Sequence, residues 1–227
     1  EWNEDNFDIN SAPLYVRQAY EAKKWAFVTD YVRLYAMTKF GGIYMDTDVE
    51  VTKKLDPFLH HDAFSFFENA TQIPTGIMAC VKDFPLFVEL LHYYDDAQFV
   101  YPDGTLNTTT NVSIITDLCL AKGLQMNNQF QIIDGFALYP NDVFCPVDYS
   151  TNLLRKTKNT VTIHWFSGSW HSNEEKLSRV QGHKRARKHY RQAKRKNLFH
   201  NMIRLPNRII RCLLKEERYE KLKNKLK

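Results

Sequence analysis

Residues 27–51, FVTDYVRLYAMTKFGGIYMDTDVEV, constrain the fold of this chain more than any other segment. Apolar positions recur at three- and four-residue spacing as far as Lys39, which is the period of an amphipathic helix. The expected apolar stripe consists of Phe27, Tyr31, Leu34, Tyr35 and Thr38. Gly41 and Gly42 end this helix, because only glycine adopts the left-handed conformation after a helix at little cost. The segment therefore predicts a helix, a glycine break and a short apolar strand over residues 43–45.

Two carboxylates, Asp46 and Asp48, follow that strand. Residues i and i+2 at a strand end point the same way, so both side chains can reach one point. Such a pair suits a divalent cation that takes hard oxygen ligands and also holds phosphates. On the preceding helix, Asp30 and Arg33 are three residues apart and share a face. A carboxylate accepts hydrogen bonds from hydroxyls and an arginine donates to phosphate or sugar oxygens, so helix face and strand end are expected to line one cleft.

Each of these signals is weak alone, since a D-x-D triplet is common and a helical Asp/Arg pair is more often a surface salt bridge. The joint pattern D-x-x-R followed by G-G-I-Y-M-D-T-D is far more specific. It resembles the glycosyltransferases with a DXD sugar-binding region, the family of the initiating α-1,6-mannosyltransferases and many capsular-polysaccharide transferases. The glucosylating bacterial toxins have the same spacing. The resemblance implies a GT-A-like fold and an enzyme that moves a sugar.

A second segment of the resembled family has the arrangement H-x-x-x-G-S-W, which His164, Gly168, Ser169 and Trp170 match by position. A lone His in an apolar strand is more often a hydrogen-bonded core residue. The resemblance implies instead that His164 contacts the metal or diphosphate and that Ser169 and Trp170 bind the diphosphate, for which an indole N–H is a pure donor. Family members begin with a strand of the type I-P-K-I-I-H, roughly forty residues ahead of the matching region. This chain starts after it, so the predicted fold lacks the usual first strand, or a divergent element takes its place.

The resemblance further implies how the site residues would act. A divalent cation, Mn²⁺ or Mg²⁺, would be held by Asp48, Asp46 and His164, and the two aspartates are the expected catalytic pair. Asp30, Arg33 and Asp46 would bind the donor sugar. The expected donor is a nucleotide-diphosphate sugar, and the expected acceptor is a glycan or a lipid-linked sugar, as in capsular or surface polysaccharide synthesis. Retention of anomeric configuration is also implied.

Two other readings of the same residues differ in function. The first is a binding protein for nucleotide sugars or carbohydrate that has the same fold and no turnover. The second, a calcium loop built on DTDVE, is excluded because the sixth and twelfth positions hold Val51 and Pro57 rather than Gly and Glu.

Composition separates an acidic body from a basic tail. The chain has 227 residues, 44% of them hydrophobic and 14% aromatic, as in a folded protein with one sizeable core. Residues 1–173 carry 12 Lys/Arg and 21 Asp/Glu, a net charge of −9, whereas residues 174–227 carry 19 and 5, a net charge of +14. Alternating short strands and helices in the body predict an α/β fold with a central mixed sheet. The charge division and the family resemblance together predict a GT-A-like catalytic domain over 1–173 and a basic, amphipathic helical extension over 174–227.

The basic extension has an apolar stripe between arginines from Leu198 onward, interrupted at Pro206. Such a pattern favours peripheral contact with an anionic membrane, which would suit a lipid-linked acceptor. A solvated helix pair and, less favoured because no recognition motif is present, nucleic-acid binding are the alternatives. No apolar run is long enough to span a membrane and the first residues, EWNEDNFDIN, do not form a signal peptide. The expected location is cytoplasmic, on the inner face of the membrane, with the four cysteines reduced and packed.

Overall fold

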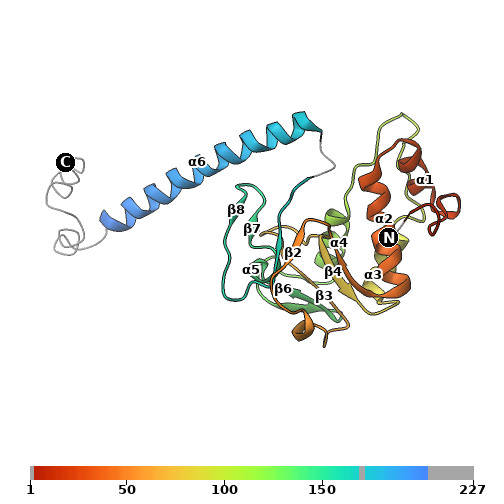
Figure 1. Cartoon of the computed structure of the whole chain (residues 1–227), viewed down its shortest axis with the longest axis horizontal. Helices are drawn as coiled ribbons and strands as arrows, with labels where there is room; N and C mark the ends of the chain where they lie inside the picture. The colour runs from red at the N-terminus through yellow and green to blue at the C-terminus, as the bar shows by residue number, and fades with distance from the viewer. Residues whose placement is uncertain (1–2, 169–171, 204–227) are drawn as a thin grey trace. The chain divides into compact units, whose positions relative to one another are not determined.

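The computed structural model describes residues 3–168 and 172–203. The chain divides into two compact units, Glu1–Trp170 and His171–Lys227 (Figure 1). The first unit contains the central sheet, and the described part of the second is one long helix.

The central sheet has five strands in the order β1-β4-β3-β6-β5, of which β3, β4 and β6 are labelled in Figure 1. Their bounds are β1 Gly42–Met45, β3 Ala63–Phe66, β4 Ile77–Cys80, β5 Gln131–Ile133 and β6 Phe136–Tyr139. β3 and β6 are parallel and the other neighbours are antiparallel, which confirms the predicted mixed sheet. Met45 pairs with Ile77, so the end of β1 lies beside the start of β4. The segments that follow β1 and precede β4 therefore meet at one edge of the sheet.

Four helices accompany this sheet: α1 Leu14–Glu21, α2 Trp25–Phe40, α3 Pro85–His92 and α4 Asn111–Ala121. Helix α2 ends at Phe40, directly before the two glycines that were predicted to end it. Gly41 has a φ of 68°, and its N–H donates to the Met37 carbonyl. The buried side chains of α2 are Val28, Tyr31, Leu34 and Met37, so the expected stripe is rotated. Phe27, Tyr35 and Thr38 are only half-buried. The rotation arises because α1 and α3 both pack against α2, which widens its apolar face beyond one stripe.

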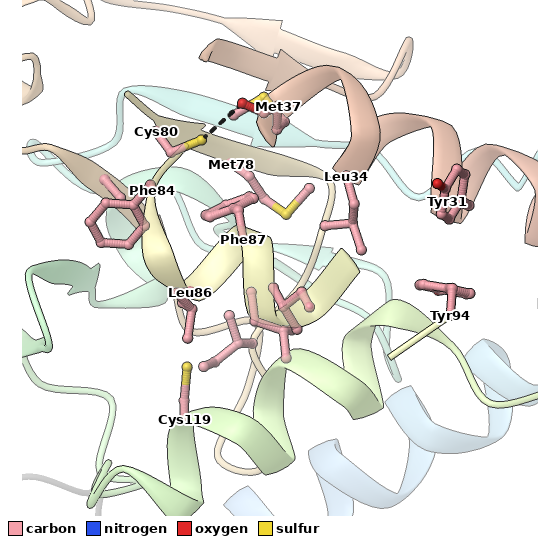
Figure 2. Close-up of a cluster of buried hydrophobic side chains, with 14 of the residues drawn as sticks. Tyr31, Leu34, Met37, Met78, Cys80, Phe84, Leu86, Phe87, Tyr94 and Cys119 are labelled. Carbon is pink, nitrogen blue, oxygen red and sulfur yellow. Dashed lines mark hydrogen bonds between the residues drawn. The ribbon is translucent and has the colours of Figure 1, made fainter. Parts of the chain in front are cut away.

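The main core lies between these helices and the sheet. Figure 2 shows Leu34 and Met37 of α2 meeting Met78 and Cys80 of β4 and Phe87 of α3. The Cys80 thiol donates to the Met37 carbonyl at 3.5 Å, which ties the last turn of α2 to β4. Cys80, Cys119 and Cys145 are free and buried, as predicted, whereas Cys212 lies outside the described residues.

A second layer was not predicted from the sequence. β2 (Val49–Val51) pairs antiparallel with β9 (Thr162–His164) in a separate two-stranded sheet, and β7 (Val147–Asp148) pairs with β8 (Leu153–Leu154). The short helix α5 (Asn141–Phe144) joins β6 to this layer. A smaller core of Phe64, Phe66, Ile77, Ala79, Ala137, Phe144 and Cys145 fills the space between. The register Val49↔His164 brings the residue after the DXD triplet next to the predicted site histidine.

The described part of the second unit is the helix α6 (Asn173–Ile203), and the predicted interruption at Pro206 lies outside the described residues. It begins with a capping box, in which the Glu175 N–H donates to the Ser172 hydroxyl and the Ser172 N–H donates to the Glu175 carboxylate. The apolar stripe from Leu198 involves side chains outside the described set. Among the described residues, none of the helices has the length and apolar character needed to cross a bilayer.

Candidate active site

Asp46 and Asp48 lie on the tight turn that joins β1 to β2, not at the end of one continuous strand. The Val49 N–H donates to the Asp46 carbonyl at 3.1 Å and closes the turn. The Asp46 N–H donates to the Gly76 carbonyl at 2.8 Å, which anchors the turn to the residue before β4. The two carboxylates therefore converge across a turn, and strand alternation, the basis of the prediction, is the wrong reason for their proximity.

His164, at the end of β9, completes a cluster with these aspartates. Its Nε2 atom lies 3.2 Å from Asp48 Oδ1 and 3.7 Å from Asp46 Oδ2. One ligand atom from each of the three residues falls within 4.8 Å of the others. His164 is 8% exposed, and its ring lies 4.1 Å from the ring of Phe166, centroid to centroid. The sequence thus correctly predicted that this histidine comes together with the DXD aspartates.

Asp48 is held by the segment that follows β9. The backbone N–H and the hydroxyl of Ser167 donate to Asp48 Oδ2 at 2.7 and 2.9 Å. The backbone N–H of Trp165 donates to the Asp48 carbonyl. Burial opposes the charge on Asp48, but the bonds from Ser167 together with His164 lower the pKa of this carboxyl below its usual range. Asp48 is therefore an anion at neutral pH, with Oδ1 left to face His164.

The cluster fits a divalent cation. Burial lowers the pKa of His164, although Asp48 and Asp46 oppose the shift, so the ring is neutral at pH 7 and has a lone pair to offer. Two carboxylate oxygens and one imidazole nitrogen form a donor set that Mn²⁺ accepts, and Mg²⁺ accepts the oxygens. The other ring nitrogen, Nδ1, is buried and has no hydrogen-bond partner among the described residues. Only the Nε2 side of the ring is thus directed at the aspartates.

Gly76 makes room for this imidazole. A Cβ atom added at Gly76 would lie 2.7 Å from His164 Cε1, 2.8 Å from Nδ1 and 3.2 Å from Asp46 Oδ2. The two contacts below 3.0 Å are shorter than real Cβ atoms make, so the imidazole would have to shift. Gly76, the residue before β4, is therefore a part of the site that the sequence alone did not indicate.

Arg33 connects the cluster to helix α2. Its Nη1 atom lies 3.3 Å from Asp46 Oδ1 and donates to the carbonyl and hydroxyl of Thr75, each at 3.3 Å. Its Nη2 atom lies 3.5 Å from Asp30 Oδ1. The guanidinium also lies 4.8 Å from the ring centroid of Tyr44, whose hydroxyl donates to Asp46 Oδ1 at 2.7 Å. Asp30 and Arg33 therefore share a site with the DXD turn, as predicted.

Asp30 and Arg33 form a mostly buried ion pair, with side chains 14% and 13% exposed. Burial raises the pKa of Asp30, while Arg33 and the Asn111 N–H counteract part of the shift. Burial also disfavours the charge on Arg33, but Asp30, Tyr44 and Asp46 outweigh it and raise the pKa of the guanidinium. A buried pair of this kind is costly to break, because the remaining partner is left uncompensated.

Four residues of the site were missed by sequence reasoning: Tyr44, Thr75, Gly76 and Ser167. Tyr44 lies inside the motif itself, so its place beside Asp46 was the easiest to foresee. The other three act through contacts formed only in the folded chain. The predicted diphosphate contacts Ser169 and Trp170 lie outside the described residues.

Comparison with known proteins agrees with this geometry. Residues 2–65 match the family described as "Glycosyltransferase sugar-binding region containing DXD motif". A 72-residue segment is 32% identical to inositol phosphoceramide mannosyltransferase 3 of Schizosaccharomyces pombe, covering 32% of this chain and 20% of that relative. The chain thus matches about one fifth of the length of this curated relative. No solved structure matches the chain. The mixed α/β body agrees with a GT-A-like fold, and the segment that matches the DXD-containing family, residues 2–65, includes the turn that carries Asp46 and Asp48.

Proposed function

We propose that this protein is a metal-dependent glycosyltransferase that moves a sugar from a nucleotide-diphosphate sugar to a glycan or lipid-linked acceptor. The observation that carries the proposal is the cluster of Asp46, Asp48 and His164, with Arg33 bonded to Asp46 beside it. The cluster offers ligands for a cation, and Arg33 adds a donor for sugar or phosphate oxygens.

Asp48, Asp46 and His164 would hold Mn²⁺ or Mg²⁺, which when bound supplies Lewis-acid stabilisation of the negative charge on the departing diphosphate. Asp30, Arg33 and Asp46 would bind the donor sugar. Ser169 and Trp170 would add donors to the diphosphate, on the strength of the sequence pattern alone. The enzyme would retain the anomeric configuration, and a role in capsular or surface polysaccharide synthesis would follow from the resemblance.

The test is nucleotide release from a panel of nucleotide-diphosphate sugars, with Mn²⁺ and with chelator. We expect Mn²⁺-dependent release by the wild-type protein and a loss of about 100-fold or more in Asp48→Asn. Asp117→Asn, the same change at an exposed position on α4, serves as the control and should retain activity. Binding of a donor without release would instead support a non-catalytic nucleotide-sugar-binding protein, and absence of binding to every donor would refute the function.

The acceptor side of the proposal rests on α6. Lys184, Arg187, Lys188, Arg191 and Arg195 lie at helical spacing along one side of this helix. The curated relative is named for mannose transfer to inositol phosphoceramide, a lipid. We propose that this basic side contacts an anionic membrane from the cytoplasmic side and brings the site to a lipid-linked acceptor.

Sedimentation with vesicles tests this contact. Binding to vesicles containing phosphatidylserine, but not to neutral ones, is expected, at roughly 1 kcal/mol per well-placed Lys or Arg. Lys188→Glu/Arg191→Glu should weaken binding more than tenfold, whereas Arg179→Glu/Arg185→Glu makes the same charge change at two cations outside the basic side and should weaken it less. An equal loss of vesicle binding in both double variants would contradict a specific membrane-binding side. Release of the protein from vesicles by duplex DNA at a lower concentration than by competing lipid would contradict it as well.

A further inference from the structure

Asn111, the first residue of α4, is bonded directly to Asp30 across 81 residues of sequence. Its Nδ2 atom donates to the Asp30 carbonyl at 2.7 Å, and its backbone N–H lies 3.3 Å from Asp30 Oδ2. Its Oδ1 atom accepts a hydrogen bond from the Tyr94 hydroxyl. With 2% of its surface exposed, Asn111 uses its amide entirely inside the protein.

These contacts fix the main chain and the carboxylate of Asp30 at the same time. The Nδ2 bond holds the turn of α2 that carries Asp30, and the backbone bond points the carboxylate at the first turn of α4. The N-terminal end of a helix favours a negative charge. Asp30 Oδ1 is left facing Arg33, and Arg33 in turn reaches Asp46. Asn111 is therefore joined to the cluster of Asp46, Asp48 and His164 through a chain of direct polar contacts.

We propose that Asn111 is a positioning residue of the donor-sugar site: by fixing Asp30, it sets the place from which Arg33 meets the donor. The inference rests on the proposed function, because the donor is the ligand that Arg33 would meet. Asn111 itself has no hydrogen bond to Asp46, Asp48 or His164.

The same burial excludes a different role for this residue. Asn111 begins an N-x-S triplet, Asn-Val-Ser, which in a secreted protein is a glycosylation acceptor. Its amide nitrogen donates to the Asp30 carbonyl inside the fold, so a glycan attached to this nitrogen does not fit the folded structure.

The experiment compares donor affinity, turnover and stability in three variants. Asn111→Ala removes both side-chain hydrogen bonds, the one to the Asp30 carbonyl and the one from the Tyr94 hydroxyl. Asn111→Asp keeps the size and the acceptor for Tyr94, but loses the donor to the Asp30 carbonyl. Asn107→Ala is the matched control, because Asn107, on the loop before α4, is also a buried Asn, and its side chain accepts a hydrogen bond from the Thr109 N–H instead of one of the contacts to Asp30.

We expect Asn111→Ala and Asn111→Asp to raise the donor Kd about tenfold or more, with Mn²⁺ affinity unchanged. Asn107→Ala should lose a similar amount of thermal stability and keep the wild-type donor Kd. If Asn111 merely filled space, Asn111→Asp would bind donor normally, and that result would overturn the inference. Equal loss of donor affinity in Asn107→Ala would overturn it as well. A wild-type protein that binds no donor would instead overturn the proposed function on which the inference rests.

Discussion

Replacement of Gly76 by alanine should damage the proposed metal site without replacing Asp46, Asp48 or His164. The new Cβ would lie 2.7 Å from His164 Cε1, and ordinary contact begins at 3.4 Å, so the ring must retreat by about 0.7 Å. Phe166, with its ring centroid 4.1 Å from that of His164, restricts this retreat. Metal–ligand bonds tolerate deviations of only about 0.2 Å. The displaced imidazole can therefore no longer share an ion with both aspartates.

We expect the Mn²⁺ affinity of Gly76→Ala to fall about 10–100-fold, the range seen when the support of a metal ligand is altered. Overpacking should cost about 1–3 kcal/mol of folding free energy, and the lower entropy of the unfolded alanine chain should return about 0.4–1 kcal/mol. The folded state therefore survives, and the loss of affinity is not a result of unfolding.

Electron paramagnetic resonance of free Mn²⁺ during titration measures the affinity, and a thermal melt measures the stability. Gly182→Ala in α6 is the control, because a Cβ there meets nothing within 4 Å. It should leave Mn²⁺ affinity unchanged and stabilise the helix by about 0.5–1 kcal/mol. Wild-type Mn²⁺ affinity in Gly76→Ala would refute the reasoning, since it would mean that His164 either moves freely or is not a ligand.

Three further predictions concern Glu68, two buried thiols and Arg33. Burial raises the pKa of Glu68 to about 7, so its contribution to stability is full below pH 4.5 and is lost as the pH rises through 7. Melts from pH 5 to 8 should show the free energy of unfolding fall by at most about 3 kcal/mol, and Glu68→Gln should remove this fall. A variant with the same pH dependence as the wild type would contradict the assignment. Burial raises the pKa of the Cys80 and Cys119 thiols to about 12, so both should resist iodoacetamide at pH 8 until the protein is denatured, as peptide mass spectrometry can check. Arg33→Lys keeps the charge but cannot reach Asp30, Asp46 and Thr75 together, so calorimetry should show donor affinity at least about tenfold weaker; equal affinity would mean that the charge alone suffices.

Local sequence signals predicted the elements whose structure is decided locally. Helix α2, its glycine end and β1 follow from apolar spacing and from the conformational freedom of Gly41, and both operate within a few residues. β2, β7 and β8 are two or three residues long and exist because a partner strand lies beside them. No signal of that length stands out from the sequence, so these elements could not be predicted from pattern alone.

The site divides in the same way. Asp30, Arg33, Asp46 and Asp48 share one helix–turn–strand segment, so their spacing already implied their proximity, and His164 was placed by a family pattern rather than by geometry. Asn111 and Ser167 were missed because their partners lie 81 and 119 residues away in sequence. Their polar types fit many loops, and nothing near them in the chain shows which carboxylate they would meet.

The bonds between Ser167 and Asp48 set an order of events during synthesis. A growing chain that has just completed the DXD segment has both aspartates but lacks the histidine, the β9 strand and the Ser167 donors. Another 119 residues must be translated before Asp48 gains these partners. Until then the two acidic side chains belong to a fragment without a fixed ion site, and a product shortened ahead of residue 164 would lack an essential ligand of the proposed centre.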